Sequence, residues 1–254
     1  MTIPKVKFVD IALSLELDML YGFLFQNDWD WGKYIIKKHP QIKPALVLKT
    51  KTARMNFLKE YVLGFRKENK ELIKNNKVKY RQEWQKIEKD FLTTLAEILE
   101  IDWPENKRTI TAMVSLNPIC PRFLNNWSFS LSYSKNLADL REVIMHEICH
   151  FLYFEKWKKL YPKMSTKKFE APHIEWHLSE IVAPIILNDE RIQPLLKQKA
   201  GFYDEHRKIK IGWQSVPKYF AALYLNNKKE GKNFADFVKH AYKVMKDNKS
   251  LFKF

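Results

Sequence analysis

Apolar residues in the N-terminal part of the chain recur three and four positions apart, the spacing of a helix with one buried face. This pattern predicts a helix over residues 9–26 and two long helices over residues 52–75 and 79–100. The buried stripe of the last helix comprises Trp84, Ile87, Phe91, Leu95 and Ile98. The pattern ends at Asp102-Trp103-Pro104, where the proline breaks the helix.

Two strands are predicted in the stretch that follows. Residues 109–116 are rich in β-branched and apolar side chains, which favour strands. In residues 127–134 large apolar side chains alternate strictly with serines. Because successive residues of a strand point to opposite faces, we expect this second strand to be half-buried and to lie near a sheet edge.

The remainder of the chain is predicted to be helical. The expected helices cover residues 137–159, 172–187, 216–225 and 234–245. Asn136 or Ser134 can cap the first of them, because both residue types accept hydrogen bonds from the first free amides of a helix. Pro172 suits the first turn of the second, where its missing N–H has no helical partner to lose.

The composition agrees with a mainly helical protein. The chain has 254 residues, 46% of them apolar, and only 6 glycines, which leaves room for few tight turns. We therefore expect an α+β, mainly helical fold in three consecutive regions: a helical region 1–105, a core 106–196 with a small mixed sheet, and a helical region 197–254.

The formal net charge of +16 is unevenly distributed. Residues 32–90 contain 17 Lys and Arg against 6 Asp and Glu, and residues 197–254 contain 14 against 5, whereas residues 91–196 contain 12 against 13. Basic flanks can bind nucleic acid, but lysine outnumbers arginine and no nucleic-acid motif accompanies them. A solvated lysine-rich surface is the simpler interpretation, so nucleic acid is not an expected partner.

Cysteine usage and hydropathy favour a cytoplasmic protein without a membrane span. Cys120 and Cys149 form no CxxC pair, which suits a reducing compartment. Asp10, Glu16 and Asp18 interrupt the apolar N-terminal stretch, so it does not have the pattern of a signal peptide. No apolar run reaches the roughly 18 residues that a span requires. The oligomeric state is left open.

The motif His146-Glu147-Ile148-Cys149-His150 lies inside the helix predicted over residues 137–159. Histidines four residues apart leave the same helix face one turn apart, close enough for both to bind one zinc ion at about 2.0–2.1 Å. Glu147 lies about 100° around the helix, too far for a ligand but within reach of a water molecule on the ion. Cys149 is expected to be a small buried side chain.

This segment resembles the zincin superfamily of metallopeptidases over roughly residues 107–190. The metzincin extension is absent, because Tyr153 and Lys156 occupy the positions of its Gly and His. The resemblance to the gluzincin branch implies a zincin-like core, with the sheet beside the HExxH helix and a third ligand, Glu180, on the next helix. Apolar residues surround Glu180 in the sequence, and a buried carboxylate needs a partner such as a metal.

Other third ligands remain open. Some small zincins use a histidine a few residues before an aromatic residue, as His173 stands before Trp176, and Glu175 and His177 are further candidates. The acid that often orients a zinc-bound histidine in gluzincins is replaced here by Pro184, for which Asp189 or Asn188 could substitute.

The resemblance also implies roles for residues outside the ligand set. Tyr203 and His206 are the candidates for stabilising the oxyanion, and residues 127–133 would pair with an extended peptide substrate. The expected function is zinc-dependent peptide-bond hydrolysis with Glu147 as general base and peptide or protein as substrate. The alternative is a non-proteolytic binding or regulatory protein that keeps the fold, with or without nucleic acid as partner.

Overall fold

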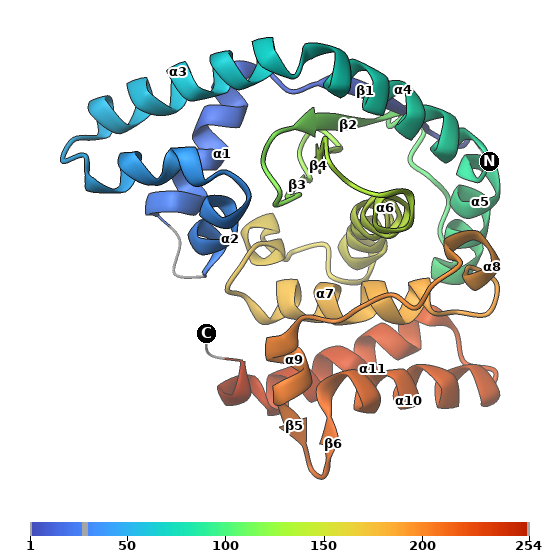
Figure 1. Cartoon of the computed structure of the whole chain (residues 1–254). Coiled ribbons are helices and arrows are strands. Elements are labelled where there is room, and N and C mark those ends of the chain that lie inside the picture. Colours follow the sequence, from blue (N-terminus) through green and yellow to red (C-terminus); the bar gives the residue numbers. More distant parts are fainter. Residues whose placement is uncertain (1, 27–29, 253–254) are drawn as a thin grey trace. The chain divides into compact units, whose positions relative to one another are not determined.

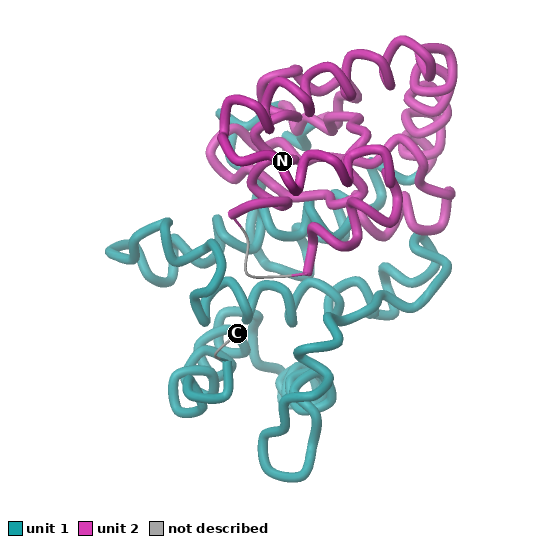
Figure 2. The backbone as a smooth tube through the Cα atoms, turned by 60° about the vertical axis from the view of Figure 1, so that its left-hand side comes forward, with its two compact units in different colours: residues 1–4, 87–108, 145–254 teal, residues 5–86, 109–144 magenta. Residues whose placement is uncertain are grey.

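The computed structural model describes residues 2–26 and 30–252 and shows a mainly helical α+β protein with a small mixed sheet (Figure 1). The chain divides into two compact units, each assembled from separate stretches (Figure 2). Unit 1 contains residues 1–4, 87–108 and 145–254, and unit 2 contains residues 5–86 and 109–144. The division into three consecutive regions stays a prediction. No helix within the described ranges combines the length and the apolar character needed to cross a membrane.

Unit 2 contains the sheet, whose strand order is β1-β2-β4-β3. The strands are β1 (Lys5–Asp10), β2 (Thr109–Ser115), β3 (Arg122–Phe123) and β4 (Ser128–Ser132). β1, β2 and β4 run parallel, and the short β3 runs antiparallel to β4. The strands expected over residues 109–116 and 127–134 are thus present, whereas β1 was not expected.

The prediction that the second strand is half-buried is wrong, because every residue of β4 is buried. Tyr80, on α4 (Lys70–Gln85), places its hydroxyl 3.2 Å from the carbonyl oxygen of Ser132 at the end of β4. The expected position near a sheet edge is confirmed, since β4 is the neighbour of the edge strand β3, which pairs with it at Ser128 and Phe129.

The N-terminal helices of unit 2 differ in their limits from those expected. The helix expected over residues 9–26 is α1 (Leu13–Phe25), because residues 5–10 pair with β2 instead. α2 (Trp31–Lys38) and the 3-10 helix η1 (Pro40–Val47) follow it.

The helices expected over residues 52–75 and 79–100 are three: α3 (Lys51–Glu68), α4 and, in unit 1, α5 (Glu88–Leu99). The first break falls at Asn69, whose side-chain amide donates to the carbonyl of Phe65 at 2.9 Å and so ends α3.

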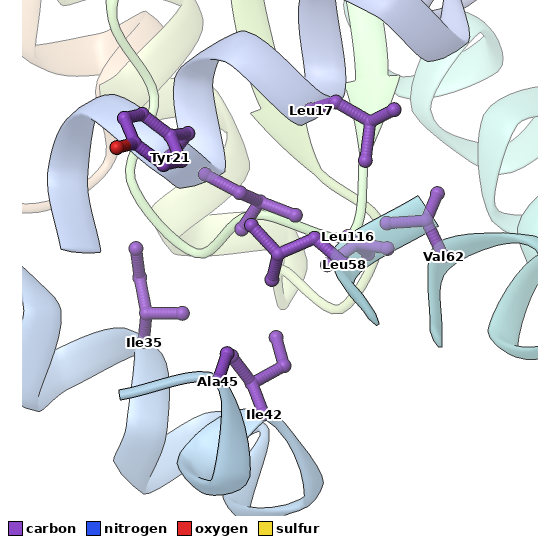
Figure 3. Close-up of a cluster of buried hydrophobic side chains, with 9 residues drawn as sticks. Leu17, Tyr21, Ile35, Ile42, Ala45, Leu58, Val62 and Leu116 are labelled. Atoms are coloured by element: carbon purple, nitrogen blue, oxygen red, sulfur yellow. The ribbon is translucent and has the colours of Figure 1, made fainter. Parts of the chain in front are cut away.

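The core of unit 2 contains residues from α1, α2, η1 and α3 and the residue that follows β2 (Figure 3). The buried cluster comprises Leu17, Leu20, Tyr21, Ile35, Ile42, Ala45, Leu58, Val62 and Leu116. Glu16 is buried beside it and accepts hydrogen bonds from Arg66 Nε (2.9 Å), Ser115 Oγ (2.7 Å) and the Leu116 amide (2.7 Å). The carboxylate therefore joins α1 to α3 and β2.

Unit 1 is helical apart from one hairpin. Besides α5 it contains α6 (Leu137–Leu160) from residue 145 onward and α7 (Ile174–Leu187), and its later elements are α8 (Gln193–Leu196), α9 (Asp204–Lys208), β5 (Lys210–Ile211), β6 (Gln214–Ser215), α10 (Val216–Lys229) and α11 (Phe234–Asp247), with 3-10 turns η2 (Thr166–Phe169) and η3 (Lys249–Leu251). The expected helices are thus confirmed.

Asn136 is the cap of α6, because its Oδ1 accepts from the amides of Ala138 and Asp139. Pro172 lies just outside α7, whose N-cap is His173.

Helix α7 lies between the unit 1 part of α6 and the pair α10 and α11 (Figure 1). All fourteen residues of α7 are buried. A helix that is apolar on most of its circumference has to be surrounded in this way. The polar side chains of α7 therefore depend on partners from the neighbouring elements.

Candidate metal centre

Two histidines project from the same face of α6. His146 and His150 are one turn apart, and their ring centroids are 4.6 Å apart with an angle of 77° between the ring planes. This arrangement follows directly from helical geometry, as the sequence predicted. The two imidazoles can therefore direct nitrogens at a common point.

Glu180, on α7, lies opposite both histidines. Its Oε2 is 3.0 Å from His146 Nε2, and its Oε1 is 3.4 Å from His150 Nε2. One potential ligand atom from each of the three residues lies within 4.8 Å of the others. The group predicted from the sequence as a ligand set is therefore assembled in space.

The three side chains of this group differ in exposure, and the Glu180 carboxylate is buried. The side chains of Glu180 and His150 are each 1% exposed, whereas that of His146 is 19% exposed. A carboxylate removed from water is stable only with hydrogen bonds and positive charge close by. The more exposed His146 marks the side from which solvent reaches the group.

The other polar side chains of α7 have partners of their own. Glu175 Oε1 accepts from the hydroxyl of Tyr242 at 2.7 Å, Ser179 Oγ donates to the carbonyl of Trp176 at 2.8 Å, and His177 bonds to His206 at 3.0 Å. Buried polar groups in native proteins are paired in this way. Glu180 differs from them because its neighbours are two potential metal ligands.

The donor set of two imidazole nitrogens and one carboxylate oxygen fits a divalent transition metal. Three protein ligands leave a coordination position for water or substrate, which distinguishes reactive sites from closed structural ones. The residues that are present therefore fit a metal on chemical grounds.

The alternative third ligands lie elsewhere. His173 is exposed at the N-cap of α7 and is not part of the assembled group. Glu175 is bound to Tyr242, with Lys168 Nζ 3.7 Å away, and His177 is paired with His206. Of the four candidates, Glu180 is the residue that the structure brings to the two histidines.

Glu147 follows the first histidine and is nearly buried, with 9% of its surface exposed. Cys149, two residues further along α6, is buried as expected. Burial raises the pKa of the Cys149 thiol, and the negative charges of Glu180 and Glu147 raise it further. The thiol therefore stays protonated, which makes it a poor metal ligand.

The two candidates for oxyanion stabilisation lie at the start of α9 and within it. Tyr203 is the N-cap of α9, and its ring centroid lies 5.7 Å from that of His206 and 6.2 Å from that of Trp176 on α7. His206 is buried, and its Nε2 lies 3.0 Å from Nδ1 of His177. The sequence singled out His206, but the pairing with His177 had no sequence signal, because the residues are 29 positions apart.

The residues considered as substitutes for the orienting acid hold the end of α7. Asn188 Nδ2 donates to the carbonyl of Ala200 at 3.1 Å, and its Oδ1 accepts from the Ala200 amide at 3.0 Å. Asp189 accepts from Tyr224 at 2.7 Å, Lys228 at 3.0 Å and Arg191 at 3.1 Å. These contacts give both residues a structural role, joining α7 to the segment after it and to α10.

No model of a known protein family matches this chain, and neither a curated protein nor a solved structure matches it. Functional interpretation therefore depends on the chemistry of the site. That chemistry is provided by three residues that could hold a metal ion, His146, His150 and Glu180, and by Glu147, which follows His146 in the sequence.

Proposed function

We propose that this chain is a zinc-dependent metallopeptidase of the gluzincin type. The observation that supports the proposal best is the buried Glu180 carboxylate, which lies 3.0 Å from His146 Nε2 and 3.4 Å from His150 Nε2. In this proposal His146, His150 and Glu180 hold the ion. A bound zinc ion would supply a Lewis acid and lower the pKa of a water molecule in the remaining position to about 7.

Glu147 is the general base of the proposed reaction. Its carboxylate takes a proton from the attacking water, whose oxygen forms a bond to the carbonyl carbon of the peptide. As the C–N bond breaks, Glu147 returns that proton to the leaving nitrogen, which gives the amine and a carboxylic acid. The second proton of the water stays on the acid, which releases it to solvent as the carboxylate forms. The low exposure of Glu147 strengthens these transfers, because bulk water does not compete for the proton.

The proposal also extends to the surroundings of the centre. We assign a zincin-like core to roughly residues 107–190. β4 is not part of this assignment as a substrate strand, because β2 and β3 already pair with it. Tyr203 and His206 are the proposed candidates for stabilising the oxyanion. The substrate class is a peptide or protein.

Replacement of Glu147 by glutamine tests the function. Glu147→Gln keeps the size of the side chain and removes its basicity, so zinc stoichiometry should stay at one while hydrolysis of quenched fluorescent peptides falls by about 10²–10⁴-fold. Glu155→Gln is the matched control on the same helix, since Glu155 bonds only to Lys158 among the contacts known for it, at 2.7 Å, and should retain full activity.

Three results would contradict the proposal. Unchanged turnover in Glu147→Gln would exclude Glu147 as the base. Loss of zinc in Glu147→Gln would make it a ligand instead. A zinc-loaded wild-type protein that cleaves no member of a broad peptide mixture would leave a metal-binding protein without peptidase activity.

A further inference from the structure

The most exposed large apolar side chain among the described residues is that of Trp213, with 86% of its surface exposed. Trp213 lies in the two-residue loop between β5 and β6, which pair as antiparallel strands. Within unit 1 this hairpin projects beyond α9 and α10 (Figure 1). The indole ring is therefore held at the tip of a protrusion.

The turn explains the glycine at this tip but not the tryptophan. Gly212 has a φ of 61°, a left-handed conformation that glycine adopts without steric cost. A two-residue loop with glycine first is the arrangement of a type II′ turn, which accepts most residue types at its second position. The indole of Trp213 makes no hydrogen bond and no ring contact with another described residue. Local structure thus leaves this large apolar ring without a role in folding.

Positive charge surrounds the hairpin. Residues 206–229, from α9 through α10, contain six Lys and Arg and no Asp or Glu. Lys208, Lys210 and Lys218 lie within five positions of Trp213 and are exposed. None of these three lysines forms an ion pair with a described residue. The tip therefore combines one exposed indole with three ammonium groups that no acid neutralises within the described ranges.

The start of α10 adds to this positive charge. The helix begins directly after the hairpin, has no acid in its first turn and has Lys218 there instead. The partial positive charge of a helix N-terminus disfavours a cation beside it, so this position does not favour Lys218 for the stability of the helix. An anionic partner, in contrast, is attracted by the lysines and by the helix end together.

We propose that the β5–β6 hairpin docks unit 1 on an anionic lipid membrane, with the Trp213 ring inserted at the membrane–water interface and Lys208, Lys210 and Lys218 on the headgroups. Tryptophan favours this interface, because its ring is apolar and its N–H can donate to water or to headgroups. Each lysine near an anionic membrane surface raises the affinity by about fivefold. Docking of this kind requires no membrane-spanning helix.

A lipid surface fits the hairpin better than a nucleic acid does. Sites for single-stranded nucleic acid combine a groove with successive stacked rings, whereas the hairpin presents a single ring on a protruding turn. Arginine is the preferred residue for nucleic-acid recognition, and Arg207, the one arginine of residues 206–229, lies 3.7 Å from Asp204. A bilayer accepts a convex tip without a complementary pocket.

Docking through the hairpin also has a consequence for the candidate metal centre. Unit 1 contains both the hairpin and the group on α6 and α7 that could hold a metal ion. A docked unit 1 therefore carries that group to the membrane surface. The inference itself does not depend on catalysis, because neither Trp213 nor the lysines belong to the metal-binding group.

Sedimentation of the full chain with sucrose-loaded vesicles tests the docking. The wild type should bind phosphatidylcholine vesicles that contain about 30% phosphatidylserine at least ~10-fold more tightly than vesicles of phosphatidylcholine alone. Binding should weaken as salt rises from about 0.1 M to about 1 M, because the Debye length falls from about 10 Å to about 3 Å.

Two variants of the tip test the ring. Trp213→Ala should lower the affinity for anionic vesicles by about 10-fold or more, because the variant loses the transfer of an apolar ring out of water. Trp213→Phe should retain most of the affinity. Val47→Ala is the matched control and should bind like the wild type. Val47 is 81% exposed and lies in unit 2, within residues 31–59, which contain eight Lys and Arg and no acid.

Charge reversal tests the lysines. Lys208→Glu combined with Lys210→Glu should lower the affinity for anionic vesicles by about 20-fold or more. The control combines Lys59→Glu with Lys67→Glu, two exposed lysines of unit 2, and changes the net charge by the same amount. It should lose much less affinity, which separates a local effect of the hairpin from general attraction by the net charge of +16.

Quenching by lipids with bromine on their acyl chains shows whether the ring enters the bilayer. Tryptophan emission of the wild type should fall on binding to such vesicles, whereas that of Trp213→Phe should change much less. Bromine cannot reach the buried tryptophans, since Trp84, Trp127 and Trp157 are at most 2% exposed.

The inference would be overturned by a wild type that bound neither vesicle, by equal binding of the wild type and Trp213→Ala, or by equal losses in the hairpin variants and their unit 2 controls. Bromine quenching that persisted in Trp213→Phe would also overturn it. Tighter binding of single-stranded DNA than of anionic vesicles, with the same dependence on Trp213, would assign the hairpin to nucleic acid instead. Absence of peptide hydrolysis would contradict only the proposed function.

Discussion

The chemical role of Glu180 depends on its burial and on the side chains that surround it. The residue type alone is compatible with a solvent-facing ion pair, which contributes little to stability. In the structure its carboxylate is 1% exposed and faces His146 and His150. A buried acid next to two imidazoles is either part of an ion pair, at a cost in desolvation free energy, or a metal ligand. A set of three donor residues, which leaves a fourth coordination position for water, favours the metal ligand.

Removal of the Glu180 carboxylate should abolish stable zinc binding. Because even partners that only support a ligand contribute about 10–100-fold to metal affinity, Glu180→Ala should weaken binding by ~100-fold or more. Zinc content after gel filtration, measured by mass spectrometry, checks this. His173→Ala is the control and should keep one equivalent, whereas zinc retained by Glu180→Ala and lost by His173→Ala would reverse the ligand assignment.

At the scale of elements, the acidic residue Asp189 links the end of α7 to α10. Asp189 accepts hydrogen bonds from Tyr224 and Lys228 of α10 and from Arg191. Burial alone would raise the pKa of Asp189, but the hydrogen bonds from these three residues outweigh it and lower the pKa to about 2. The charged form of Asp189 is therefore favoured by folding, and it fixes α7 against α10.

Asp189→Asn should destabilise unit 1 by about 2 kcal/mol near neutral pH, because it removes hydrogen bonds to a charged group. The native pKa lies below the ordinary value of 3.8, so the contribution is complete above about pH 4 and is lost as the pH falls toward 2. Urea denaturation at pH 7, 4 and 3 should show a shrinking difference from the wild type.

The exposed pair of Asp247 with Lys243 provides the control for this measurement. Asp247→Asn should change the free energy of unfolding by no more than about 0.5 kcal/mol at any of these pH values. A difference between Asp189→Asn and the wild type that stayed constant down to pH 3 would argue against the assigned role of the charge.

At the scale of the whole molecule, both units contain buried neutral histidines. In unit 2, His39 Nδ1 lies 2.8 Å from the hydroxyl of Tyr61, and its Nε2 lies 2.9 Å from the carbonyl of Leu116. Burial lowers the pKa of His39, against the hydrogen bond to Leu116 and the charge of Glu16. Unit 1 contains the pair His177 and His206, whose pKa values burial also lowers.

These histidines should make the protein acid-sensitive below about pH 6.5. In that range the unfolded chain binds protons that the folded state excludes, so stability falls with falling pH. Each such histidine contributes a slope of about 1.4 kcal/mol per pH unit until its folded pKa is reached. Urea denaturation of the zinc-free protein at pH 7.5, 6.5 and 5.5 checks this prediction.

Variants identify the histidines responsible. His39→Gln should reduce the pH dependence of unit 2. His177→Asn should reduce that of unit 1 only in part, because His206 remains, whereas substitution of the exposed His240 should leave both unchanged. A stability that did not change between pH 7.5 and 5.5 would show that these imidazoles are protonated in the folded protein.

The sequence by itself determined the features that depend on local geometry. The four-residue spacing of His146 and His150 places both rings on one helix face wherever that helix lies, and Asn136 caps the same helix through contacts two and three residues away. The strands over residues 109–116 and 127–134 were also recognisable, because side-chain pattern and β-propensity act within a few residues.

Tertiary structure decided the features that depend on burial and on distant partners. The choice between Glu180 and His173 as the third member of the group depends on which residue of α7 contacts the histidines of α6. Glu180 contacts His146, which is 34 positions away in the sequence. Pairing with β2 made residues 5–10 a strand, and folding buried every residue of β4, its serines included. The His177–His206 bond likewise required α7 and α9 to meet. Local sequence patterns do not predict such contacts, because the free energy of these contacts comes from groups that only folding brings together.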